Sequence, residues 1–192
     1  MTIAAFRFRH TARQRGFSLI EVSIVTAIVL LLAIIGIPAI GGYVVENKVP
    51  KVGEELARFI LQVKVNASVG AGQPYADIDT AHFANLVRDS GIFSVTGVGA
   101  GAQVLHGLGN DGRVTVAPQG AGESFSLELT NVNHAACPAL ASVMQRVVDT
   151  ISVAGEGQAG ATVKDAATAY SALATEAQCV QGDRNTFVFV AS

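Results

Sequence analysis

The chain has 192 residues, is half hydrophobic, and carries 15% charged residues with a formal net charge of −2. Residues 1–16 contain four arginines and no acid, whereas the remainder holds nine lysines and arginines against fifteen acids. The apolar content excludes a disordered chain, and the acidic remainder repels nucleic acid and anionic lipid over most of its surface. We therefore expect no nucleic-acid partner.

A long apolar stretch begins at Phe17, and no charged residue occurs from Ala27 to Val45. A helix of this length can cross a bilayer. The preceding arginines favour an orientation in which residues 1–16 stay in the cytoplasm and the residues after Val45 lie outside. A cleavable secretory signal would have a shorter apolar core. A buried helix of a soluble protein does not fit the basic leader. A plain signal anchor fits both length and charge but gives no reason for Glu21.

Glu21 lies inside this stretch, four residues after Phe17. A carboxylate in a transmembrane helix costs about 2.5–3.5 kcal/mol near the bilayer centre and less near its edge, so it usually has a functional partner. Cleavage between Gly16 and Phe17 would create an ammonium group near the membrane surface. That group could pair with Glu21 of a neighbouring subunit, as charges in a low dielectric require.

The segment Gly-Phe-Ser-Leu-Ile-Glu-Val at residues 16–22 resembles the class III signal of type IV prepilins and pseudopilins. The resemblance implies that a prepilin peptidase cuts after Gly16 and methylates Phe17, and that Glu21 guides docking into a filament. It implies a non-enzymatic structural subunit of a homo-oligomeric helical pilus. The implied partners are the prepilin peptidase, the pilus assembly platform, minor pilins and, before assembly, the membrane.

Pro38 and the glycines Gly36, Gly41 and Gly42 interrupt the apolar helix. Proline removes a backbone donor and clashes with the preceding turn, and glycine adds flexibility. One interpretation is a kink of the kind that membrane helices tolerate. The other is a segment that unwinds when subunits pack. Type IV pilins have a helix-breaking proline at the matching place, so the resemblance favours a helix break at Gly36 and Pro38.

The next segment predicts an amphipathic continuation of the helix. Pro50 suits a first helical turn, and apolar residues then recur at helical spacing until about Ser68. These residues are Val52, Leu56, Phe59, Ile60 and Val63. The expected organisation is a cleaved leader (1–16), a transmembrane and filament-core helix (17–45), its amphipathic continuation (46–70) and a globular domain (71–192).

The globular domain is predicted to mix short helices with strands, which indicates an α+β fold. We expect helices over 81–89, 135–148 and 165–176, strands over 113–117, 124–130, 150–153 and 185–190, and a glycine-rich loop over 97–112. The resemblance implies the type IV pilin fold, in which a long bent N-terminal helix packs on an antiparallel sheet with a disulfide-bounded C-terminal region.

The chain has two cysteines, Cys137 and Cys179, which are either two separate thiols or one disulfide. Export across a membrane favours the disulfide, which would stabilise the fold by about 4 kcal/mol in the chain-entropy model. The sequence around them resembles the b-type class of type IV pilins in residues 123–129, 131–140 and 183–190. Phe17 and the short leader instead resemble the a-type class, so the subclass stays open.

Other signals predict no cofactor, metal or catalytic site. The glycine run 97–101 is followed by neither a helix nor a suitably spaced acid, as a nucleotide-binding loop requires. The histidines His10, His82, His106 and His134 lack metal-ligand spacing. No Gly-X-Ser-X-Gly elbow occurs. The basic residues Lys48, Lys51, Arg58 and Lys64 predict a solvated or subunit-facing helix surface.

The resemblance thus implies a bacterial inner-membrane precursor that is assembled into an extracellular pilus, with adhesion, aggregation or motility as its role. A minor pilin and a type II secretion pseudopilin share the same N-terminus, but pseudopilins often lack the cysteine pair. A monomeric membrane-anchored binding protein is an alternative of another class, and it leaves Glu21 and the Gly16–Phe17 junction unexplained. The choice between major and minor pilin stays open.

Overall fold

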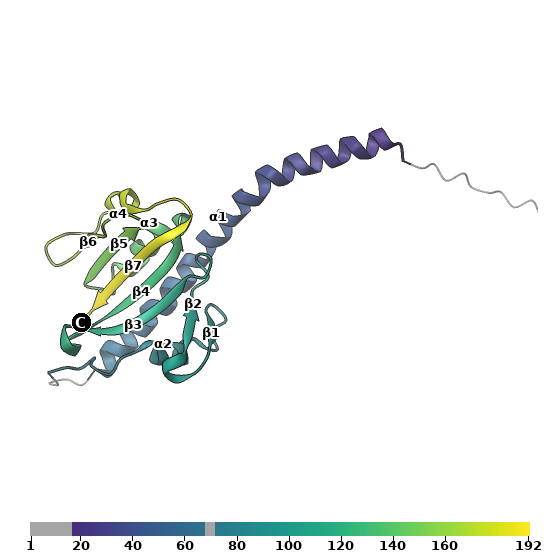
Figure 1. Ribbon diagram of the computed structural model, residues 1–192. Helices are drawn as coiled ribbons and strands as arrows, with labels where there is room; N and C mark the ends of the chain where they lie inside the picture. The colour runs from purple at the N-terminus through teal and green to yellow at the C-terminus, as the bar shows by residue number, and fades with distance from the viewer. Residues whose placement is uncertain (1–16, 68–71) are drawn as a thin grey trace, which may run out of the picture. The chain divides into compact units, whose positions relative to one another are not determined.

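The structure is a computed structural model that describes residues 17–67 and 72–192 (Figure 1). The chain divides into two compact units, with the boundary between Ile40 and Gly41. Helix α1 (Leu19–Asn66) runs across this boundary, so the predicted long N-terminal helix is confirmed. We call residues 19–40 the apolar half of α1, and the unit Gly41–Ser192 the head.

Within the described residues, the head contains one antiparallel sheet of seven strands in the order β1-β2-β3-β4-β7-β5-β6. The strands are β1 (Ser94–Thr96), β2 (Gln103–Leu105), β3 (Arg113–Gln119), β4 (Ser124–Asn133), β5 (Thr150–Gly155), β6 (Ala161–Lys164) and β7 (Asp183–Ala191). Strand β7 pairs with both β4 and β5, so the last strand of the chain lies inside the sheet (Figure 1).

The core lies on one face of this sheet because apolar residues alternate along its three inner strands. The cross-strand pairing aligns them in rows from β4 through β7 to β5. The rows are Leu127–Phe189–Ile151 and Leu129–Phe187–Val153, and all six side chains are buried. Burying each such side chain contributes about 1.5–3 kcal/mol relative to leaving it exposed.

The head portion of α1 covers this face with its apolar stripe (Figure 1). The stripe consists of Val49, Val52, Leu56, Phe59 and Ile60, each at most 3% exposed. Gly53 allows α3 to approach, because a Cβ there would lie 2.6 Å from Val143. The amphipathic spacing in the sequence therefore corresponds to the observed contact surface.

Helix α2 (Thr80–Val87) starts one residue before the expected 81–89 helix and ends two residues before its expected end. Asp79 is the N-cap, and its Oδ1 accepts a hydrogen bond from the His82 backbone N–H at 3.0 Å. That bond is the largest cause that lowers the pKa of the Asp79 carboxyl. The helix packs Phe83 edge-on against Phe59, with ring centroids 5.0 Å apart.

The sheet extends further than the sequence predicts on both sides. The glycine-rich segment 97–112 is not all loop, because β2 lies inside it with Val104 buried. Strand β6 was also not expected, since its four residues lie between a glycine-containing turn and an alanine-rich segment. Such short strands form through pairing with neighbours rather than through local preference.

Two helices differ in extent from the prediction. Helix α3 (Cys137–Met144) is shorter than the expected 135–148, and the Lys164 ammonium donates to the Gln145 carbonyl just beyond its end at 2.6 Å. Helix α4 (Ala172–Gln178) starts later than residue 165. The Asp165 carboxylate accepts backbone N–H groups of residues 167 and 168, which closes a local turn and lowers the pKa of that carboxyl.

Candidate functional site

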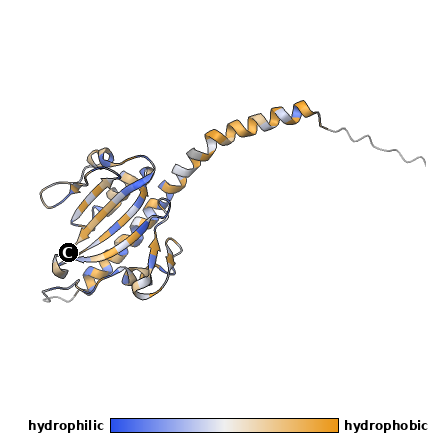
Figure 2. Ribbon diagram, viewed as in Figure 1, coloured by the Kyte–Doolittle hydropathy of each residue, from blue (hydrophilic) through white to orange (hydrophobic). Residues whose placement is uncertain are grey.

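The apolar half of α1 exposes nearly its entire hydrophobic surface (Figure 2). Its large apolar side chains are all at least half exposed: Leu19, Ile20, Val22, Ile24, Val25, Ile28, Val29, Leu30, Leu31, Leu32, Ile34, Ile35, Ile37 and Ile40. By length and composition α1 can cross a membrane, and it is the one helix of this kind in the described part of the chain. A surface of this extent requires an apolar environment or apolar neighbours.

The hydroxyl groups in the apolar half are satisfied by the helix itself. Ser23 Oγ donates to the Ile20 carbonyl at 2.8 Å, and Thr26 Oγ1 donates to the Val22 carbonyl at 2.6 Å. Serine and threonine are therefore compatible with lipid or with a helical bundle here, because they present no unpaired donor.

Glu21 differs from these hydroxyls. Its side chain is exposed and, within the described residues, makes no ion pair. It borders a shallow, mostly apolar hollow together with Phe17, which is 82% exposed. The expected cleavage residue Gly16 lies outside the described residues, so its junction with Phe17 stays a prediction. In residues 17–67 and 72–192, the Glu21 carboxylate thus lies in an apolar surface and has no ion-pair partner.

The segment around Pro38 is helical in the single chain, because α1 continues from residue 36 through residue 42. A Cβ at Gly36 or Gly41 would meet nothing within 4 Å, so these positions leave the helix backbone bare. The boundary between the two units falls in the same segment. The proposed helix break at Gly36 and Pro38 in a filament stays a prediction.

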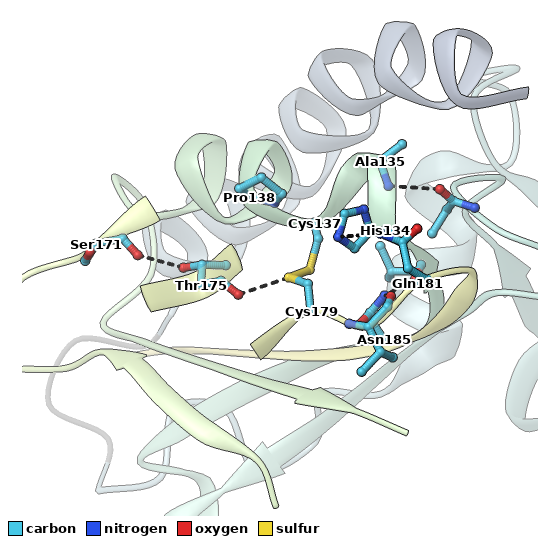
Figure 3. The surroundings of a disulfide bond; sticks show 12 residues. His134, Ala135, Cys137, Pro138, Ser171, Thr175, Cys179, Gln181 and Asn185 are labelled. Carbon is cyan, nitrogen blue, oxygen red and sulfur yellow. Dashed lines mark hydrogen bonds between the residues drawn. A yellow bond between two sulfur atoms is a disulfide. The ribbon is translucent and has the colours of Figure 1, made fainter. Parts of the chain in front are cut away.

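Cys137 and Cys179 form a disulfide (Figure 3). Cys137 is fully buried at the start of α3, and Cys179 follows the last residue of α4. The bond closes a 42-residue separation that contains α3, β5, β6 and α4. The predicted disulfide-bounded C-terminal region is confirmed.

The end of this region is fastened to the sheet by Asn185, which is fully buried (Figure 3). Its Nδ2 donates to the carbonyls of Val132 at 3.0 Å and Val180 at 2.9 Å, and its Oδ1 accepts the Val180 backbone N–H at 2.7 Å. On the other side, Tyr170 bridges α3 by donating to the Pro138 carbonyl at 3.1 Å. The exposed outer part of the region is therefore held at both of its ends.

His106 is a buried structural histidine rather than a ligand. Its Nδ1 accepts the Leu108 N–H at 3.0 Å, so its Nε2 carries the proton and donates to the Thr130 carbonyl at 2.8 Å. Burial lowers the pKa of this imidazole. Among the described residues no group of three or more histidine, cysteine or acidic side chains could hold a metal ion. The sequence could not predict this structural role, because His106 stands alone and its partners Leu108 and Thr130 are brought to it only by the fold.

The glycine run near residue 99 forms a short 3₁₀ turn, Gly99–Gly101, that leads into β2. A phosphate-binding loop requires a helix N-terminus directly after the glycines, and here a strand follows. The nucleotide-binding interpretation remains without support from the described geometry.

The described part of the chain combines an apolar helix that is long enough to cross a membrane with a disulfide-closed α+β head. Among these residues, Glu21 on that helix has no ion-pair partner. Residues 75–192 match the family model described as PilS N terminal, and residues 11–37 match the prokaryotic N-terminal methylation motif. The first match covers well over half of the chain. The chain therefore belongs to the PilS family of type IV pilins.

The chain is similar to one solved type IV pilin, TcpA from the Vibrio cholerae El Tor biotype. The identity is 14%, the TM-score is 0.43, and the alignment covers 77% of this chain and 99% of that chain. No curated protein sequence matches the chain.

Proposed function

We propose that this chain is a structural subunit of a type IV pilus, inserted in the inner membrane as a prepilin and assembled into a surface filament. A prepilin peptidase removes residues 1–16 and methylates Phe17. The filament then serves adhesion, aggregation or motility. The N-terminal methylation motif and the exposed apolar half of α1 support this proposal.

The observation that carries the proposal is Glu21, an exposed carboxylate on an otherwise apolar helix surface that has no ion-pair partner among the described residues. In a bundle of such helices, apolar side chains exchange lipid for identical neighbours, and packing contacts rather than water exclusion select the geometry. A carboxylate in that bundle needs a cation. The new ammonium group of Phe17 on an adjacent subunit supplies it, and the pair sets the axial register of the helices.

The cysteine-bounded region favours a pilin over a type II secretion pseudopilin, since pseudopilins often lack the cysteine pair. The same region, which supplies β5 and β6 to the sheet, supports placing the subunit with the b-type class. A minor pilin shares these features and differs in abundance. The composition of sheared surface filaments decides between the two, because a major pilin is the main component.

Replacing Glu21 with Ala or Gln tests the role of the carboxylate. Ser23→Ala, two residues further along the same helix, is a matched control. We expect the Glu21 variants to remain in the membrane fraction while the yield of sheared filament falls at least about tenfold, as expected for loss of a desolvated charge pair. Ser23→Ala should assemble normally. A normal filament yield from Glu21→Gln would refute the role assigned to the charge.

A further inference from the structure

Two lysines of α1 border a hollow of about 430 Å³ on the head. Lys48 and Lys51 line one wall, and the opposite wall comes from β2 and from the glycine-rich segment 107–112. Both lysines are exposed, and no carboxylate among the described residues lies within 4.0 Å of either ammonium. The Lys48 ammonium instead lies 3.4 Å from the Gly107 carbonyl, at the limit of a hydrogen bond. Asp111 also borders the hollow, so the charged residues that line it, two lysines and one aspartate, carry a net charge of +1.

Two other basic residues of α1 do have a carboxylate close by. Arg58 pairs with Glu55 at 2.6 Å, and Lys64 approaches Asp149 at 3.8 Å. The pair at Lys48 and Lys51 is therefore a local excess of positive charge on a head that is acidic as a whole.

The segment 107–112 that forms the opposite wall is held in place by buried contacts. His106 fixes it through Leu108 and Thr130, and the Asn133 N–H donates to the Leu108 carbonyl at 2.9 Å. A Cβ at Gly112 would lie 2.3 Å from the His106 ring, so the segment packs directly on the histidine. A wall fixed before binding lowers the ordering cost of association.

An unpaired acidic edge lies at the other end of the head portion of α1. Asp77 and Glu123 are both exposed, and in the described part of the chain neither has a cation within 4.0 Å. Their loops are joined, because the Tyr75 N–H donates to the Gly122 carbonyl at 3.0 Å. Asp77 also borders a separate hollow of about 390 Å³, which is lined by the last turns of α1.

The two features lie far apart within one head. The hollow at Lys48 and Lys51 is lined by α1 near residues 48–52. The hollow bordered by Asp77 is lined by residues 59–67. Asn66 follows Lys48 by eighteen residues, which is about 27 Å along the helix axis. The lysines and the acidic edge cannot pair within one molecule, but they can pair between two molecules.

We propose that the hollow at Lys48 and Lys51 receives the acidic edge at Asp77 and Glu123 of a second copy of this chain. This inference rests on the proposed function as a filament subunit. The contact uses two different surfaces, so it is heterologous, and heterologous contacts extend into open helical filaments when the rotation does not close. Opposite charges at the two ends also select the relative direction of neighbouring subunits.

Charge reversal tests the contact in cells that express the full chain. Lys48→Glu with Lys51→Glu should reduce sheared filament yield at least about tenfold, because like charges then face each other. Asp77→Lys with Glu123→Lys should do the same. Combining all four substitutions should restore assembly. Arg88→Glu with Arg146→Glu gives the same change in net charge at other exposed sites and should assemble normally.

Zero-length carbodiimide cross-linking of wild-type filaments tests the same contact without a variant. We expect amide bonds that join a peptide containing Lys48 or Lys51 to one containing Asp77 or Glu123. Filaments that lack these bonds, a lysine variant that assembles normally, or a fourfold variant that stays defective would each overturn the inference. Absence of filaments from the unmodified chain would instead overturn the proposed function.

Discussion

The apolar half of α1 and the head portion of the same helix present two different surfaces (Figure 2). Between Leu19 and Ile40 apolar side chains occupy all sides of the helix, and Leu19 is 91% exposed. Between Val49 and Ile60 they form one stripe, and every member of the stripe is buried. One continuous helix therefore has a stripe that its own head buries and an apolar surface that stays exposed in the single chain.

This difference teaches that helix formation and burial are separate questions. A helix with one apolar face finds its partner inside the same domain, whereas a helix that is apolar all round requires a membrane or a bundle. The position of Glu21 adds a second distinction. Head acids such as Glu55 find cations in the same chain, but Glu21 does not among the described residues.

The largest expected effect separates the two surfaces directly. Phe59 is buried and contacts the rings of Phe83 and Phe125. Phe59→Ala should lower the free energy of head unfolding by about 3–5 kcal/mol, because it removes apolar contacts and leaves a cavity. Ile34→Ala in the apolar half is the matched control and should leave head unfolding unchanged. Denaturant unfolding of the full chain in detergent measures both, and equal effects would contradict the comparison.

The disulfide comes next in size, and it belongs wholly to the head. Replacing Cys137 and Cys179 together by Ala should cost about 2–5 kcal/mol, since the closed loop restricts the unfolded chain. Reduction of the wild-type protein should give a similar loss. Thermal unfolding with and without reductant makes the measurement. A variant as stable as the oxidised wild type would show that the sheet alone determines head stability.

A smaller effect is expected at the start of α2. Asp79→Ala removes the acceptor for the His82 backbone N–H and should destabilise the head by about 1 kcal/mol. Asp79→Asn keeps a capping oxygen and should recover most of that loss. Denaturant midpoints of the two variants give the comparison. If both variants lose the same stability, the ion pair with His82 rather than the cap carries the effect.

The pH dependence of the head should reveal His106. Burial, the largest cause, lowers its pKa, while the Thr130 acceptor and the charge of Asp183 act in the opposite direction. The unfolded chain therefore binds a proton at higher pH than the folded head does. The head therefore keeps the full stability that neutral His106 allows above about pH 6.5. It loses stability as the pH falls from there toward the lowered pKa of His106 in the folded head.

His106→Gln keeps a neutral side chain and removes this titration. The difference in unfolding midpoint between wild type and His106→Gln should therefore change between pH 7.5 and pH 5.5, with the wild type losing more. His82 and the half-buried His134 are present in both proteins, so their contributions cancel in the difference. Parallel pH curves would contradict the buried role of His106.

The sequence predicts the features that repeat or alternate. The apolar run of α1, the stripe around Leu56 and the alternating core of β7 all follow from periodicity, and each is confirmed in the structure. These features can be predicted because each depends on residues that are close together along the chain.

The features that depend on distant residues were not predicted. Strand β2 forms because Val104 pairs with both Val95 and Val114, and its local sequence indicates a loop. The delayed start of α4 reflects a turn closed by Asp165. The hollow at Lys48 exists because segment 107–112 folds against α1. No local pattern contains these long-range contacts.

The most direct test of the account is the intact mass and N-terminal sequence of this chain in filaments sheared from the cell surface. We predict a chain that begins at N-methylated Phe17 and retains its disulfide. A chain that still carries residues 1–16 in cells with active prepilin peptidase, or a sheared fraction that lacks the chain altogether, would contradict the filament assignment.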